Sequence, residues 1–312
     1  MDDVEVRELR YFLAVAATLN FSRAAERLGI AQPPLSRAIR QLESRLDVRL
    51  FERDTRRVML TPAGQTLSEA APAALDVLAA AVRRAQRAGS VLPSLVVTAK
   101  PGIASGLLQQ IVASYTALPD PMPVEIAVSG YRQQADMVRD GRADVALLSS
   151  PYDERGLESE PLTSEPRVAA LSPDHPLARR NTLRCKDFSG EPIPRWTGST
   201  SEERSYWSGQ DRELSGPSRV RHPNTERQGP EVNNETELLE VVSLAQAIAL
   251  IPASLARRNA RPDIVYRPVH DASPYVIAVA WPEGARASSI AAFVRAAVDL
   301  TSPGSRAAQA IG

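Results

Sequence analysis

Apolar residues recur at three- and four-residue spacing in two neighbouring segments near the start of the chain, and this period predicts two short helices. In the first segment, residues 21–28, Ala24 and Ala25 share a face with Leu28, and their small side chains would let another helix approach closely. In the second segment, residues 32–46, an apolar stripe leaves the opposite side polar. The pattern therefore predicts a tight helix pair whose second member keeps a polar face outward.

Residues suited to helix ends border both segments. Ser22 is predicted to be the N-cap of the first helix, because its hydroxyl can accept a hydrogen bond from the first turn. Gly29 is expected to end that helix, since glycine adopts a left-handed conformation at no steric cost. Pro33 and Pro34 fall in the first turn of the second helix, where proline is tolerated.

The polar face of the second helix suits DNA. Arginine pairs in bidentate fashion with guanine and glutamine with adenine, while serine and helix N-terminal amides bond phosphate. An ordinary solvated helix surface is the alternative interpretation. The outward set is Gln32, Ser36, Arg37 and Arg40.

The flanking segments favour DNA binding over that alternative. Residues 9–16 form a predicted amphipathic helix that can cover the apolar side of the pair. Residues 50–53 and 58–61 are predicted to be two strands that enclose a basic turn, which makes a small wing. Another helix begins with Thr61 as its N-cap and Pro62 at its first position.

With these elements in place, residues 7–88 resemble the N-terminal half of the LysR-type transcriptional regulators. The match is carried by six ordered runs, at residues 9–12, 21–28, 31–37, 41–43, 50–53 and 60–64. The resemblance implies a mainly α-helical winged helix-turn-helix domain (1–64), a linker and dimerisation helix (65–90), and a two-lobed α/β effector domain like a periplasmic binding protein (91–302).

The resemblance also implies which residues contact DNA. Pro33, Pro34, Ser36 and Arg37 match the DNA-contact positions of the family, and Gln32, Arg40 and Ser22 complete the predicted surface. Arg53 and Arg56 on the wing are expected to meet phosphate or the adjacent minor groove.

A longer helix is predicted to follow the wing, over residues 62–88. Its apolar residues alternate at spacings of four and three from Leu67 to Ala85, which suits a coiled coil between two copies of the chain. Packing of this helix on its own domain is the alternative. Pro72 is expected either to bend the helix or to mark where the seam begins.

From residue 95 the pattern alternates between strand and helix, which predicts a parallel α/β unit with right-handed crossovers. The predicted strands are 95–98, 124–128 and 143–148, and the predicted helices are 103–118 and 133–140. A second unit of the same kind is predicted from a strand at 167–171, a helix at 235–244 and a strand at 247–251. A strand at 275–280 and a helix at 288–300 are expected to return to the first unit.

The resulting domain has two lobes joined by two crossing connections, near residues 161–166 and 262–269. We expect lobe I to comprise about 91–162 and 267–302, lobe II about 163–266, and residues 303–312 to form a flexible tail. Residues 140–147, 172–177 and 249–252 echo the family. The polar segment 198–231 matches nothing in it.

Ligands of such sheets bind beyond the carboxyl ends of the strands. Applied here, this rule together with the expected entry of residues from lobe II predicts an effector site between the lobes. Its predicted residues are Lys100, Pro101, Gly102, Ser129, Gly130, Tyr131, Ser149, Trp196, Thr197 and Ser199. Lys100 favours an anionic effector, although a solvated surface lysine is an equal alternative. Simple edge packing is the alternative for Tyr131, and a place in the core of its own lobe is the alternative for Trp196.

Composition limits the remaining possibilities. The formal net charge is zero, but residues 1–88 hold 14 Arg against 11 Asp and Glu, a net charge of +3 on the predicted DNA-binding part. No run of 18 apolar residues predicts a membrane span, and the acidic N-terminus is unlike a signal peptide, so we expect a cytoplasmic protein. Cys185 is the single cysteine and is expected to be an inert, buried thiol.

The sequence shows no metal-ligand cluster, nucleophile elbow or phosphate-binding glycine loop, so neither an enzyme nor a cofactor is predicted. The predicted function is a DNA-binding transcriptional regulator controlled by a small-molecule effector. Its expected partners are a partly palindromic duplex, the effector, further copies of the chain in dimers or tetramers, and RNA polymerase. An intracellular small-molecule binding protein without regulatory DNA binding is the alternative.

Overall fold

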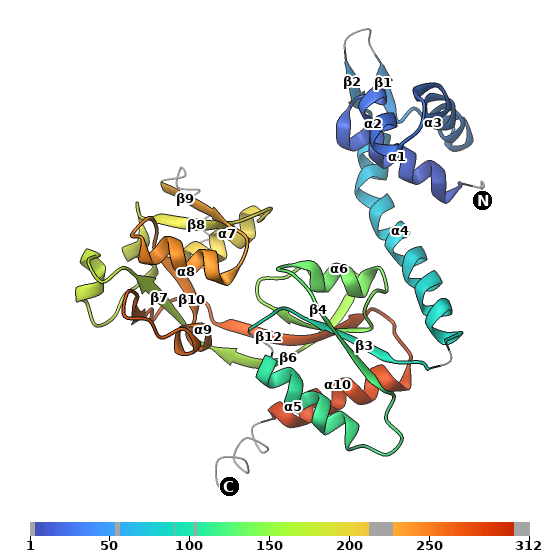
Figure 1. Cartoon of the computed structure of the whole chain (residues 1–312). Helices are drawn as coiled ribbons and strands as arrows, with labels where there is room; N and C mark the ends of the chain where they lie inside the picture. Colours follow the sequence, from blue (N-terminus) through green and yellow to red (C-terminus); the bar gives the residue numbers. More distant parts are fainter. Residues whose placement is uncertain (1–3, 54–56, 91, 103–104, 212–226, 303–312) are drawn as a thin grey trace. The chain divides into compact units, whose positions relative to one another are not determined.

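The computed structural model describes residues 4–53, 57–90, 92–102, 105–211 and 227–302. They divide into two compact units, one comprising residues 1–90 with 139–142 and the other comprising the rest of the chain. The predicted fold class is confirmed, because a winged helix-turn-helix and a two-lobed α/β region flank a long helix (Figure 1).

The first unit begins with helices α1 (Val6–Thr18), α2 (Phe21–Leu28) and α3 (Gln32–Leu46). Their shared core buries Ala24 and Ala25 of α2 against α1 and α3, as the small side chains predict. Gly29 ends α2 with a φ of +67°, which also confirms its predicted role. Ser22 is not the N-cap; Asn20 is, and its side chain accepts a hydrogen bond from the amide of Arg23 at 3.0 Å.

The wing consists of strands β1 (Phe51–Arg53) and β2 (Val58–Leu60), which pair antiparallel. Glu43 of α3 holds the start of β1, since its Oε1 accepts hydrogen bonds from the amides of Leu50 (2.9 Å) and Phe51 (3.1 Å). The wing also approaches the next helix so closely that a Cβ on Gly64 would lie 2.1 Å from the Leu50 carbonyl oxygen. A backbone contact of this kind admits only glycine.

Helix α4 (Pro62–Ala88) is continuous through Pro72, and Thr61 caps its start as predicted. Three large apolar side chains of α4 remain exposed within the single chain: Val77 (66%), Leu78 (41%) and Val82 (50%). The predicted seam is therefore not buried on the helix's own domain over this stretch.

The first lobe of the second unit is built on a sheet of order β4-β3-β5-β12-β6. Its strands are β3 (Leu95–Ala99), β4 (Val124–Val128), β5 (Val145–Ser149), β6 (Leu157–Glu165) and β12 (Tyr275–Pro282). Helices α5 (Ser105–Thr116) and α10 (Ser288–Thr301) cover one face, and α6 (Gln133–Arg139) covers the other (Figure 1). Strands β3, β4 and β5 are parallel as predicted, whereas β12 runs antiparallel to both its neighbours.

The second lobe differs from its prediction. Strand β7 (Arg167–Leu171) pairs antiparallel with β10 (Ala249–Pro252) and with β11 (Val265–Pro268), so a second parallel unit is wrong. Local periodicity predicts a strand but not its direction, which here depends on long connections. A separate parallel pair, β8 (Pro192–Trp196) with β9 (Arg227–Val232), accompanies helices α7 (Ser201–Ser208), α8 (Glu235–Ser243) and α9 (Ala253–Arg258). Two 3-10 helices, Pro176–Arg179 and Cys185–Phe188, complete this lobe.

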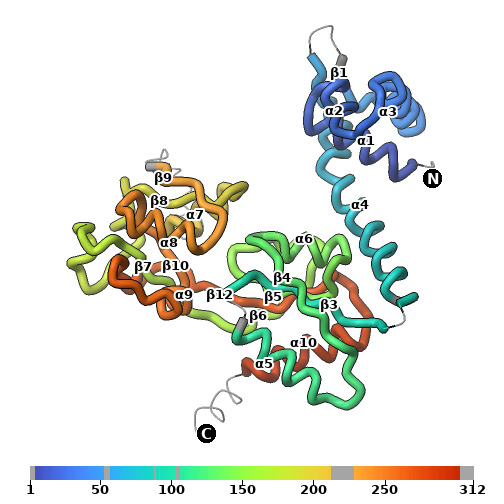
Figure 2. Tube along the Cα trace, viewed as in Figure 1, coloured from blue at the N-terminus to red at the C-terminus, as the bar shows by residue number. Residues whose placement is uncertain are grey.

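The chain crosses between the lobes twice (Figure 2). The first crossing is at Pro166, between β6 and β7, and the second spans residues 269–274, between β11 and β12. Residues 161–165, predicted to be part of a connection, instead complete β6. This strand has a polar sequence because it lies at the edge of the sheet and is mostly accessible.

Glu43 provides a test of how the wing is attached. Replacement by Ala leaves two buried amides without an acceptor, so we expect the opening free energy of residues 32–60 to fall by about 2 kcal/mol. Glu43→Gln keeps an oxygen acceptor and should lose less than about 1 kcal/mol. Hydrogen exchange on the full chain measures both, with the exposed Glu52→Ala as a control. Equal losses in the Gln and Ala variants would contradict the assigned role.

Candidate functional site

The N-terminal half of α3 presents a polar face to solvent. Leu35, Ile39 and Leu42 are fully buried, which fixes the rotation of the helix about its axis. Ser36 links the outward side chains, because its hydroxyl accepts a hydrogen bond from Gln32 Nε2 at 2.8 Å and its carbonyl oxygen accepts one from Arg40 Nε at 3.2 Å. The polar face is thus partly ordered by its own contacts.

The other predicted DNA-contact residues that the structure describes are exposed in α3 or in the first turn of α2. Arg37 is exposed on the same face, and Pro33 and Pro34 are exposed in the first turn of α3. Ser22 is exposed in the first turn of α2. The Arg53 side chain and all of Arg56 lie outside the described residues.

Between the lobes, aromatic side chains from both sides meet. Tyr131, in the loop after β4, stacks on Trp196 of β8 with ring centres 4.4 Å apart and planes 21° apart. Its hydroxyl oxygen accepts a hydrogen bond from Trp207 Nε1 of α7 at 3.1 Å. Trp207 in turn packs edge-on against Tyr206 and lies 6.3 Å from the ring of Tyr275. Burial raises the pKa of the Tyr131 hydroxyl, so the group stays neutral at physiological pH.

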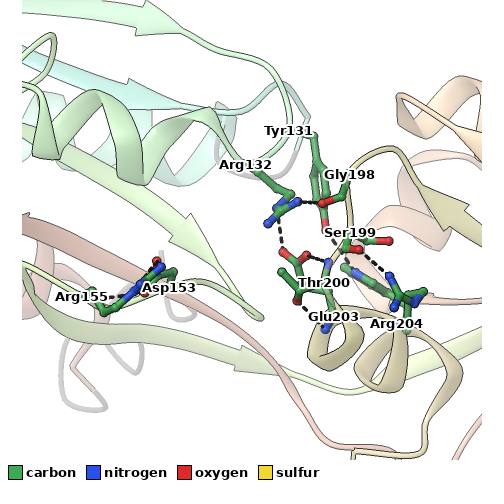
Figure 3. A network of polar contacts seen from close by, with 10 residues as sticks. Tyr131, Arg132, Asp153, Arg155, Gly198, Ser199, Thr200, Glu203 and Arg204 are labelled. Atoms are coloured by element: carbon green, nitrogen blue, oxygen red, sulfur yellow. Dashed lines mark hydrogen bonds and ion pairs between the residues drawn. The ribbon is translucent and has the colours of Figure 1, made fainter. Parts of the chain in front are cut away.

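An ion pair reinforces this junction (Figure 3). Arg132 adopts a φ of +67°, and its Nε lies 2.8 Å from Glu203 Oε1 in α7. Its guanidinium also donates a hydrogen bond to the carbonyl oxygen of Gly198. The other oxygen of Glu203 accepts a hydrogen bond from the amide of Thr200, the N-cap of α7, so one carboxylate serves both the helix cap and the lobe contact.

Lys100 at the end of β3 faces the same aromatic group. Its Nζ lies 5.3 Å from the centre of the Tyr131 ring and 5.8 Å from that of Tyr275. Burial lowers the pKa of Lys100 to about 8; the charge of Glu235 opposes the shift and that of Arg258 adds to it. Burial raises the pKa of the Glu235 carboxyl, because it likewise disfavours the charged form of that group.

Glu235 and Arg258 come from the second lobe. Glu235 is the first residue of α8, and Arg258 is the last residue of α9. A Cβ on Gly102, whose φ is +81°, would lie 3.1 Å from Glu235 Oε2 and 3.9 Å from an Arg258 nitrogen. The loop after β3 therefore contacts the second lobe through charged side chains.

The other predicted effector residues have varied surroundings. Ser129 is buried inside the first lobe, where its hydroxyl lies 2.8 Å from that of Thr98 and accepts a hydrogen bond from Gln134. Ser149 lies beside the buried hydroxyl of Tyr275. The Thr197 hydroxyl bonds to Asn233 in its own lobe. Pro101, Gly130 and Ser199 retain exposure.

Arg167 joins the two crossing connections. It follows Pro166 of the first crossing, and its Nε donates a hydrogen bond to the carbonyl oxygen of Ser273 in the second, at 2.6 Å. Another guanidinium nitrogen donates to the Tyr206 carbonyl oxygen at 2.6 Å, and the group stacks 3.8 Å from the Tyr206 ring centre. Arg167 is 1% exposed, so this arginine fixes the connections between the lobes from inside.

Sequence reasoning missed Tyr206, Trp207, Glu203 and Arg167 as interlobe residues. The first three lie in the polar segment 198–231, where the aromatic pair Tyr206-Trp207 was the available signal. Arg167 is the first residue of a predicted strand. Only its position beside a connection between the lobes indicates that it is an interlobe residue.

The remaining chemistry is limited in the described part of the chain. Cys185 is half-buried, and burial raises its pKa to about 12, so its thiol stays protonated as expected for an unreactive group. His175 has a structural role as the N-cap of a 3-10 helix. Within the described ranges, no three His, Cys, Asp or Glu side chains gather as metal ligands would. No helix of those ranges combines the length and the hydropathy of a membrane crossing.

Comparison with known proteins identifies both units. The LysR substrate binding domain matches residues 88–301, and the bacterial regulatory helix-turn-helix of the lysR family matches residues 6–65. The Hca operon transcriptional activator HcaR of Escherichia coli (strain K12) is 30% identical over 296 residues, covering 93% of this chain and 96% of HcaR. The regulator AlsR of Bacillus subtilis (strain 168) is 35% identical over 192 residues, covering 61% of this chain and 63% of AlsR.

Solved structures agree on the fold. CbnR, a LysR family transcriptional regulator, is 21% identical with a TM-score of 0.55, covering 96% of this chain and all of CbnR. A point mutant of full-length BenM is 25% identical with a TM-score of 0.53, covering 95% of this chain and 96% of BenM. The homologues and the family are regulators and not enzymes, as predicted.

The shifted pKa of Lys100 predicts a pH-dependent stability. The folded chain disfavours the charged form of the Lys100 amine, so this residue destabilises the fold while the amine is charged. The destabilisation is complete below pH 8 and is lost as the pH rises to 10.5, the pKa of the amine in the unfolded chain. After allowance for partial exposure, Lys100→Met should stabilise the chain by about 1–2 kcal/mol at pH 7 and by little at pH 10.5. Thermal unfolding at both pH values measures the difference, with the exposed Lys186→Met as a control. An equal gain at both values would show that packing alone is responsible.

Proposed function

The chain belongs to the LysR family of transcriptional regulators, and we propose that the exposed face of α3 is the surface with which it reads DNA. The observation that carries this proposal is the division of α3 into a fully buried apolar stripe and an outward polar set. That division leaves Arg37 free to enter a major groove while Ser36 and the start of the helix approach phosphate. Arg53 and Arg56 remain proposed backbone or minor-groove contacts.

Two copies of the chain would pair through α4. The exposed side chains Leu78 and Val82 lie within the predicted seam, and burial against a second copy would remove them from water. A two-fold dimer spaces two recognition helices along a partly palindromic site. Further association of dimers into tetramers, contact with RNA polymerase and a cytoplasmic location are parts of the same proposal, as are domain boundaries at 64 and 90.

The effector is proposed to bind between the lobes beside Lys100, Tyr131 and Trp196. The meeting of strand ends, aromatic rings and a half-buried amine supports this place. Lys100 and Arg258 supply two cationic groups against the single carboxylate of Glu235, which favours an effector with an anionic group. Such a ligand shifts the equilibrium between two arrangements of the lobes only by the difference in its affinity for them.

Arg37 tests the proposed DNA surface. Arg37→Ala removes a potential bidentate base contact, so we expect specific affinity for a duplex from the gene's own upstream region to fall by about tenfold or more. Gel-shift titration measures the loss, and circular dichroism checks folding. Arg7→Ala, which removes an exposed arginine from α1, should have little effect. The opposite ranking of the two variants would refute the assignment.

The proposed dimer seam has its own test. Leu78→Glu places a charge in the seam and should convert the dimer to monomer at micromolar concentration, because burying an unpaired carboxylate costs several kcal/mol. Sedimentation velocity gives the oligomeric state. Ala73→Glu is the matched control, since Ala73 is exposed about 140° around the helix from Leu78. Dissociation by the Ala73 variant alone would place the interface on another face.

A further inference from the structure

Tyr131 is held on the second lobe through both its ring and its hydroxyl. The ring stacks on Trp196 with ring centres 4.4 Å apart, and the hydroxyl oxygen accepts a hydrogen bond from Trp207 Nε1 at 3.1 Å. Trp196 and Trp207 are each only 7% exposed. Tyr131 of the first lobe therefore covers aromatic surface of the second lobe that a ligand could otherwise contact.

Arg132, the next residue, has a backbone conformation that arginine disfavours. Its φ is +67°, in the left-handed region, where a residue with a Cβ is strained. Its Nε lies 2.8 Å from Glu203 Oε1, and its guanidinium donates a hydrogen bond to the Gly198 carbonyl oxygen (Figure 3). Strain of this kind persists where surrounding contacts compensate for it. Both of these contacts are made to the second lobe, so Arg132 has them only while the lobes are together.

The contacts of residues 131–132 are separate from those at the crossing connections. The loop follows β4, whereas the first crossing follows β6 and the second precedes β12. At the crossings, Arg167 donates a hydrogen bond to the Ser273 carbonyl oxygen, and the Tyr206 hydroxyl donates one to the Pro274 carbonyl oxygen at 3.0 Å. The contacts of residues 131–132 can therefore break while those at the crossings stay intact.

From this arrangement we infer that Tyr131 and Arg132 form an interlobe latch, which keeps the lobes together when no ligand is bound and which can open by itself. The consequence for regulation rests on the proposed effector site, because Tyr131 occupies one face of Trp196. An effector that binds against this face must first displace Tyr131. Its apparent dissociation constant then rises as the fraction of chains with an open latch falls.

Hydrogen exchange at two indoles of the full chain tests the latch. The Nε1–H of Trp207 is bonded across the lobes to Tyr131, so its exchange with solvent reports the open form. The Nε1–H of Trp281 is the internal reference, because it bonds to Glu158 at 3.0 Å within the first lobe. Nitrogen-15 TROSY spectra, recorded without DNA or effector, measure both exchange rates.

Arg132→Ala should raise the exchange rate of the Trp207 indole hydrogen by about tenfold, because loss of a charged hydrogen-bonding group favours the open latch. The Trp281 rate should stay the same. Glu203→Gln keeps an oxygen acceptor for the N-cap amide of α7 but loses the charge that pairs with Arg132. It should raise the Trp207 rate by about threefold or more, and it tests the latch even if Arg132→Ala does not fold.

Arg155→Ala is the matched control. Arg155 pairs with Asp153 at the same 2.8 Å, but both residues lie in the first lobe, so its loss should leave both indole rates unchanged (Figure 3). A Trp207 rate that neither Arg132→Ala nor Glu203→Gln raises overturns the inference. An equal rise at Trp207 and Trp281 also overturns it, because that result means a general loss of stability. Failure of the proposed DNA surface or effector site would not alter these rates.

Discussion

Burial of one stripe of α3 is the constraint on which the DNA-binding unit depends. Leu35, Ile39 and Leu42 lose all contact with water, and the small Ala24 and Ala25 of α2 let the helices come close enough for this. A helix whose apolar stripe is fully buried has a fixed rotation, so its outward residues are fixed as well. The same helix carries Glu43, which holds the wing, and one helix therefore orients both proposed DNA-contacting elements.

The effector unit depends on a different kind of contact. Each lobe has a hydrophobic cluster of its own, and a further cluster spans both, because Tyr275 of β12 is buried together with aromatic side chains of the second lobe. Tyr131 and Arg132 of the first lobe add a stacked ring and an ion pair to this junction. Arg167 fixes the crossing connections from within, so relative movement of the lobes would have to occur around it. A ligand that contacts these side chains would shift the lobes only if it bound one arrangement of them better than another.

Sequence reasoning located the helices and the strands of the first lobe because their periodicity reflects burial on one side. It failed where the determining contact lies far away in the chain. Strand β6 has a polar sequence because it is an edge strand, and the antiparallel direction of β7 depends on partners about 80 and 100 residues distant. The capping error was local: Asn20 and Ser22 are both good N-caps, and the helix starts earlier than the serine requires. Lys100 and Tyr131 were found from the strand-end rule, whereas Trp207 and Glu203 lie in a segment without any family pattern.

The central claim is that the exposed face of α3 contacts duplex DNA, and photocrosslinking tests it most directly. A benzophenone amino acid placed at Gln41, which is exposed about 40° around the helix from Arg37, leaves the proposed contact residues intact. On irradiation of the full chain with a duplex from its upstream region, position 41 should crosslink to DNA, and the same group at Arg7 on α1 should not. Crosslinking from position 7 without any from position 41 would contradict the account.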